Sequence, residues 1–205
     1  MTPSDLPRLH VIVDSVELAR AALDGGTPLL QVRVKDVSDR ERFERTAEIA
    51  DLCRTRGATC IVNDRADVAF AVGADGVHVG ADDLPVTVVR QIVGSRLLIG
   101  GTARDPATAR RLVAASADYL GVGPCYPTAS KNGLPEPGGP ERVRAVASAV
   151  DVPVVAIAGI TADRVPELVA AGAWGVAVIS AVRDADDPAQ ATKELLAALD
   201  EATYG

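Results

Sequence analysis

Short runs of branched aliphatic residues recur along the whole chain, separated by segments with the spacing of amphipathic helices. The eight runs lie at residues 9–14, 29–35, 59–64, 76–80, 97–102, 119–123, 153–159 and 175–180. In the segment 38–57 between two of them, Phe43, Ala47, Ala50 and Cys53 recur every three or four positions, which predicts one apolar helix face. Eight consecutive strand–helix units without a break in composition are typical of an α/β fold, the (β/α)8 TIM barrel. We expect one domain over residues 1–205, with an irregular tail over residues 1–8.

Composition limits which cellular compartment and which classes of binding partner are expected for this barrel. Hydrophobic residues make up 48% of the 205 positions and aromatic residues only 3%, so the core must be aliphatic. The net charge of −7 argues against nucleic acid as a partner. Three cysteines without a CxxC pair favour a reducing compartment, and neither a signal peptide nor an apolar run of membrane-spanning length is present. We expect a cytoplasmic protein that does not contact membranes.

The stretch QVRVK at residues 31–35 alternates polar and apolar side chains. Because barrel strands are covered on both faces, Val32 and Val34 should face the helices. Gln31, Arg33 and Lys35 should then point inward, toward the mouth at the carboxyl ends of the strands. Cations are seldom buried without a partner, so the row predicts either a bound anion or a salt bridge to a neighbouring strand. We favour the bound anion.

Carboxylates follow the third and fourth strand runs. Asp64 comes directly after Asn63, and Asp82 and Asp83 follow the run that ends at Gly80. Adjacent strands lie about 4.8 Å apart, so these carboxylates can share one hard cation such as Mg²⁺. Helix capping explains the same residues equally well, and spacing alone leaves both interpretations open.

Further polar groups follow later strands. Residues 124–140 form a proline-rich connection much longer than usual, in which Thr128, Ser130 and Lys131 are donors suited to phosphate, and we interpret it as an active-site loop. Small residues after the seventh and eighth runs, including Gly159 and Ser180, predict a second anion site. His78 alternates with glycines and can point inward, where an acid–base role and a hydrogen-bonded core role both remain open.

With these residues identified, the sequence resembles the thiamine-phosphate synthase family from residue 9 to about 183. The matching segments are QxRxK at 31–35, NDRADVA at 63–69, GADGVHVG at 73–80, DLP at 83–85, GVGPxxPTxSK at 121–131, AIAGI at 156–160 and GVAVISA at 175–181. The resemblance implies a transferase of thiamine biosynthesis. Such an enzyme condenses 4-amino-5-hydroxymethyl-2-methylpyrimidine diphosphate with a thiazole phosphate, and it releases pyrophosphate through a carbocation-like step with Mg²⁺.

The resemblance also implies roles for individual residues. Arg33, Lys35 and Lys131 would carry catalysis at the diphosphate, with Asp64 and Asp83 as metal ligands. The remaining substrate-binding positions implied by the family are Gln31, Asn63, Thr102, Thr128, Ser130, Gly159, Ile179 and Ser180.

Two other functions compete with this one. A thiazole tautomerase of the same family would need the histidine that ends its fifth-strand motif, and here that position is Arg104. A catalytically silent phosphate-binding relative would have lost most motif residues, whereas this chain keeps them. We therefore predict an enzyme with small-molecule substrates, and self-association into a homo-oligomer is compatible with the sequence.

Overall fold

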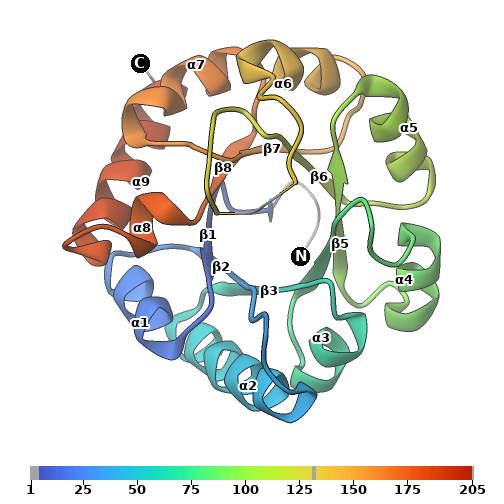
Figure 1. The fold of residues 1–205 in the computed structure, drawn as a ribbon, viewed down its shortest axis with the longest axis vertical. Coiled ribbons are helices and arrows are strands. Elements are labelled where there is room, and N and C mark those ends of the chain that lie inside the picture. Colours follow the sequence, from blue (N-terminus) through green and yellow to red (C-terminus); the bar gives the residue numbers. More distant parts are fainter. Residues whose placement is uncertain (1–4, 131–132, 205) are drawn as a thin grey trace.

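The computed structural model describes residues 5–130 and 133–204, and these form a closed barrel of eight parallel strands in the order β1 to β8 (Figure 1). The strands are β1 Leu9–Val13, β2 Leu29–Val32, β3 Thr59–Asn63, β4 Gly76–Val79, β5 Leu98–Ala103, β6 Tyr119–Val122, β7 Val154–Ile157 and β8 Gly175–Val178. The predicted TIM barrel is confirmed.

A helix follows each strand and packs outside the barrel (Figure 1). The helices are α1 Val16–Asp24, α2 Asp39–Arg56, α3 Ala66–Val72, α4 Val86–Val93, α5 Pro106–Ala114, α6 Gly139–Ala147, α7 Val165–Ala170, α8 Ser180–Arg183 and α9 Pro188–Tyr204, with a 3-10 turn at Ala162–Arg164 before α7. Within the described ranges, no helix is both long and apolar enough to cross a membrane.

Alternation along the strands divides the apolar residues into two layers. The larger layer lies between strands and helices and includes Val11, Val32, Val62 and Ile99. The smaller layer closes the barrel floor. Its buried members are Leu6, Ile12, Leu29, Ile61, Leu98, Tyr119, Val155 and Ala177.

Local signals in the sequence explain where several helices begin and end. Asp105 caps α5 by accepting from the Thr108 N–H at 2.8 Å, and proline follows at the first helical position. Gly57 ends α2 with a left-handed φ of 69°, which glycine adopts without strain. Helix positions are thereby fixed relative to the strands that they follow.

An arginine ties α4 to the amino-terminal side of the barrel. The Arg90 guanidinium donates to the carbonyls of Gly94, Leu97 and Ser116, at 2.8, 3.0 and 2.8 Å, and to the Asp118 carboxylate at 2.6 Å. The same Asp118 oxygen accepts from the Ile99 N–H of β5 at 2.7 Å. This network supports the barrel on the side opposite to its mouth.

Two local predictions were wrong. Strand β2 ends at Val32, so Arg33, Val34 and Lys35 belong to the loop that follows, although Val34 is still buried. In α2 the buried stripe comprises Thr46, Ile49, Ala50 and Cys53, whereas Phe43 is 42% exposed. Two overlapping stripes in α2 satisfy a spacing of three or four, and packing selects the one that contains Ile49.

Candidate active site

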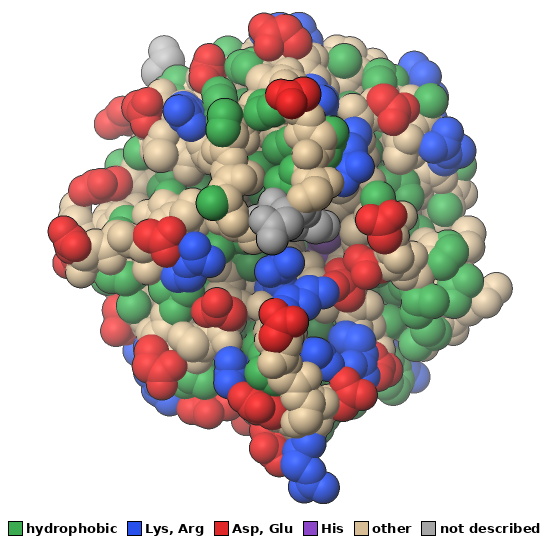
Figure 2. Space-filling view, viewed as in Figure 1, with side chains coloured by type: hydrophobic (Ala, Val, Ile, Leu, Met, Phe, Trp, Pro, Cys, Tyr) green, Lys and Arg blue, Asp and Glu red, His purple; other side chains and the backbone are tan. Residues whose placement is uncertain are grey.

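A cavity of about 220 Å³ opens at the carboxyl ends of the strands. On this face, Lys and Arg side chains gather beside the central hollow (Figure 2). The cavity is lined by every predicted site residue that the structure describes: Gln31, Arg33, Lys35, Asn63, Asp64, Asp83, Thr102, Thr128, Ser130, Gly159, Ile179 and Ser180. The remaining prediction, Lys131, lies outside the described residues. Their convergence agrees with the location of active sites in TIM barrels.

The cations of the QVRVK stretch have different surroundings. Lys35 forms a salt bridge with Asp64, and its side chain is 44% exposed, so the expectation of a fully interior row was wrong for Lys35. Arg33 makes a backbone hydrogen bond to Val13, but its guanidinium has no partner among the described residues. The salt-bridge interpretation therefore holds for Lys35, whose partner Asp64 directly follows β3. The bound anion at Arg33 stays a prediction.

Two carboxylates meet beside Lys35. Burial, followed by contact with the Asp64 carboxyl, raises the pKa of Asp83, and a hydrogen bond from the Gly80 N–H to Asp83 at 2.8 Å acts in the opposite direction. Neither aspartate caps a helix, because no side-chain cap is present at the start of α3 or α4. The capping interpretation was therefore wrong.

Asp64 is also held in an unusual backbone conformation. Its φ is 62°, and its N–H donates to the His78 carbonyl at 2.8 Å, which extends the pairing of β3 with β4. A left-handed conformation outside glycine is uncommon, although Asp tolerates it better than most residues. The turn aims the carboxylate across the mouth toward Asp83 instead of along the strand.

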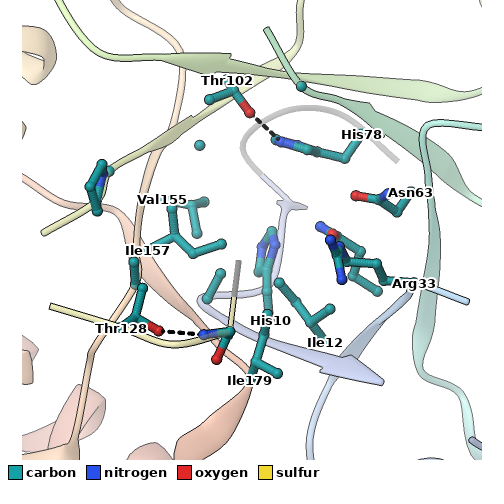
Figure 3. Close-up of a pocket in the computed structure, with 18 of the residues that line it drawn as sticks. His10, Ile12, Arg33, Asn63, His78, Thr102, Thr128, Val155, Ile157 and Ile179 are labelled. Carbon is teal, nitrogen blue, oxygen red and sulfur yellow. Dashed lines mark hydrogen bonds between the residues drawn. The ribbon is translucent and has the colours of Figure 1, made fainter. Parts of the chain in front are cut away.

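The opposite wall of the cavity includes Thr128, Ile157 and Ile179, which face Arg33 and Asn63 across the opening (Figure 3). There the Thr128 hydroxyl accepts from the Ser130 N–H at 3.2 Å.

Gly159 allows the loops after β6 and β7 to approach closely. It has a φ of 66°, and a Cβ atom at this position would lie 2.5 Å from the Pro127 carbonyl oxygen. Any other residue would separate these loops. Around Gly159 the wall therefore presents backbone groups and the hydroxyls of Thr128 and Ser130 to the cavity.

The cavity floor contains aromatic and imidazole groups that the sequence interpretation left unassigned or undecided. His10 is buried, and its Nε2 lies 3.0 Å from the Pro7 carbonyl oxygen. Burial lowers the pKa of His10 to about 3, so the ring is neutral. His78 lines the cavity as the alternation with glycines predicted. Tyr119 was missed, although alternation with Gly121 on the same strand would have indicated its inward direction.

Ala81 and Arg104 also line the cavity. The Arg104 Nε atom is buried and lacks a hydrogen-bond partner among the described residues. These positions adjoin the ends of β4 and β5, on the side of the mouth that holds His78.

A closed barrel whose cations, carboxylates and hydroxyls converge in one mouth cavity is a TIM-barrel enzyme with sites for anionic small molecules. A family model described as thiamine monophosphate synthase matches residues 8–182. The chain belongs to this family.

Individual relatives agree with the family match. Thiamine-phosphate synthase from Salinispora arenicola is 52% identical, and the match covers 96% of this chain and 99% of the relative. Thiamine-phosphate synthase from Haloquadratum walsbyi is 45% identical over 92% of this chain and 86% of its own. A solved structure, thiamine phosphate pyrophosphorylase from Pyrococcus furiosus, has a TM-score of 0.88 and 38% identity, with 97% of both chains covered.

Proposed function

We propose that the chain is a thiamine-phosphate synthase, a transferase that joins the hydroxymethylpyrimidine diphosphate to a thiazole phosphate and releases pyrophosphate. The observation that carries this proposal is a cavity with two unlike walls. Arg33 and Asn63 lie on one side of the cavity and Thr128 lies on the other (Figure 3). Lys35 follows Arg33 in the same loop, and Gly159 lies against Pro127, the residue before Thr128. Two phosphorylated substrates that must meet in one cavity need two such anion sites.

The cationic wall suits a diphosphate leaving group. The Arg33 guanidinium is free to make a bidentate contact with phosphate oxygens, and the neighbouring Asn63 amide adds a neutral donor. The C–O bond of the pyrimidine ester breaks, and its electron pair leaves with the diphosphate. Fixed positive charge at that point stabilises the transition state because it requires no reorganisation.

The paired aspartates suit a divalent cation. Asp64 and Asp83 adjoin each other at the mouth, and contact with the Asp64 carboxyl disfavours the ionised form of Asp83, an effect that a bound cation would offset. The described residues contain no cluster of three or more metal-ligating side chains, and two carboxylates plus substrate phosphates is a common ligand set for Mg²⁺. We propose that Asp64 and Asp83 hold Mg²⁺, which would neutralise the leaving diphosphate.

The opposite wall suits the thiazole phosphate. Gly159 exposes backbone at the end of β7, and Ser180 begins α8 after β8, with Thr128 and Ser130 contributing hydroxyls. The site would hold the thiazole so that the lone pair of its nitrogen forms the new C–N bond to the carbocation. Alignment of the two substrates is the main catalytic demand on this wall.

The thiazole tautomerase is the alternative. Arg104 stands where that enzyme would need a histidine, and Arg33, Lys35 and the aspartate pair have no use in a tautomerase that lacks a diphosphate. Incubation of the purified protein with both substrates and Mg²⁺ tests the proposal through the amount of thiamine phosphate formed. Isomerised thiazole without thiamine phosphate would support the tautomerase instead. The cytoplasmic location and the homo-oligomer stay predictions.

A further inference from the structure

Three side chains form a hydrogen-bonded chain that runs from the barrel floor into the cavity. The Tyr119 hydroxyl lies 3.1 Å from His78 Nδ1, and His78 Nε2 lies 3.1 Å from the Thr102 hydroxyl (Figure 3 shows the second contact). All three line the cavity, and Tyr119 is buried in its floor. They come from β6, β4 and β5, so the barrel itself fixes their separation.

Two glycines make room for this chain. Gly100 pairs with His78 on one side and with Tyr119 on the other. A Cβ atom at Gly100 would lie 2.2 Å from Tyr119 Cζ and 2.4 Å from His78 Nδ1, and one at Gly121 would lie 2.9 Å from His78 Cε1. The rings thus occupy the space that side chains at these positions would fill, which holds both rings in place.

Burial fixes the direction of the hydrogen bonds at the Tyr119 end. Burial also raises the pKa of Tyr119 far above its usual value, so the phenol keeps its proton. His78 Nδ1 is the only hydrogen-bond partner of this phenol among the described residues. If Nδ1 carried a proton, the phenolic hydrogen would be buried without an acceptor, which is unfavourable. Tyr119 therefore donates to His78.

The same donor-to-acceptor direction continues from His78 to Thr102. Because Nδ1 accepts, the ring proton of His78 lies on Nε2, and Nε2–H donates to the Thr102 hydroxyl. A hydroxyl that accepts still has its own hydrogen to donate. Thr102 has no other side-chain partner among the described residues, so its O–H is available to a ligand in the cavity.

We propose that Tyr119 and His78 are positioning residues that turn Thr102 into a hydrogen-bond donor for a ring nitrogen of the pyrimidine substrate. This inference rests on the proposed function. The apolar floor beneath His78 suits an uncharged heteroaromatic ring better than a phosphate. The free guanidinium of Arg33 lies elsewhere in the cavity, which leaves the Thr102 side for the ring.

Binding measurements test the donor at Thr102. Calorimetric titration with the pyrimidine diphosphate alone should show about tenfold weaker binding for Thr102→Val and near-normal binding for Thr102→Ser, because only the first loses the hydroxyl. Tyr119→Phe should weaken binding several-fold while it keeps the ring that packs in the floor. The control Tyr126→Phe removes a phenol that bonds Glu167 outside the cavity, and it should bind normally.

Nuclear magnetic resonance tests the relay without reference to activity. Two-bond ¹H–¹⁵N spectra of protein with labelled histidine should show His78 protonated on Nε2 alone, and Tyr119→Phe should shift population toward the Nδ1–H form. A proton on Nδ1 in the wild type, or on both nitrogens, would overturn the relay.

The two proposals fail in different ways. A wild-type protein that makes thiamine phosphate, but whose Thr102→Val variant binds the pyrimidine diphosphate normally, would overturn the donor role and leave the synthase standing. Absence of thiamine phosphate would overturn the synthase, and with it the assignment of the ligand, whereas the His78 spectrum would still report the relay.

Discussion

The buried imidazole of His10 should make the barrel sensitive to mild acid. In the folded protein the pKa of His10 is lowered to about 3, whereas the ordinary value is 6.5. Below pH 6.5 the His10 imidazole therefore binds a proton in the unfolded chain but not in the folded chain. The free energy of unfolding consequently falls as the pH decreases from 6.5 toward 3. At pH 5, about 1.5 pH units below 6.5, the loss attributable to His10 is about 2 kcal/mol relative to pH 7.5.

Urea denaturation at pH 7.5 and pH 5, followed by the fluorescence of the single Trp174, measures this loss. His10→Gln is the matched variant, because a glutamine amide can still donate to the Pro7 carbonyl but does not titrate. Other groups titrate in both proteins, so their contributions cancel in the comparison. The variant should lose about 2 kcal/mol less than the wild type between the two pH values. Equal losses in the two proteins would refute the assignment of a buried neutral imidazole to His10.

Three further predictions concern the site and its support. Arg33→Ala should lower kcat/KM for the pyrimidine diphosphate about 100-fold. Its free energy of unfolding should stay almost unchanged, because the guanidinium has no partner to lose, and the exposed control Arg110→Ala should change neither quantity. Normal kinetics of the Arg33 variant would contradict the leaving-group role. Synthase activity should vanish in EDTA and return with excess Mg²⁺, and full activity in the chelator would exclude the metal role of Asp64 and Asp83. Arg90→Ala should lower the free energy of unfolding by about 2 kcal/mol in urea titrations, because its removal leaves several carbonyls unsatisfied. A loss below about 0.5 kcal/mol would contradict the stabilising role of the Arg90 hydrogen bonds.

The barrel was predictable because its signals are repeated. Eight aliphatic runs with helical spacing between them need no tertiary information, and each observed strand starts within one residue of its predicted start. Strand ends were less predictable. Lys35 extends the alternating pattern, yet the strand stops at Val32 and Lys35 reaches solvent. Alternation reports the direction of side chains but not the residue at which pairing ends.

The site was predictable where charge made residues conspicuous. Arg33 and Asp64 stand out in an aliphatic chain, and their positions after strands imply the mouth of the barrel. Tyr119 was not conspicuous, since an aromatic residue in a buried strand is compatible with ordinary core packing. Its importance appears only when three strands place it beside His78, in space that Gly100 leaves open. Such a juxtaposition depends on strand register, which a single sequence does not specify.

The most direct measurement of the proposed function is product formation by the purified protein. With the pyrimidine diphosphate, the thiazole phosphate and Mg²⁺, chromatography should detect thiamine phosphate and pyrophosphate in equal amounts. Absence of thiamine phosphate, with the thiazole phosphate either unchanged or only isomerised, would contradict the synthase assignment.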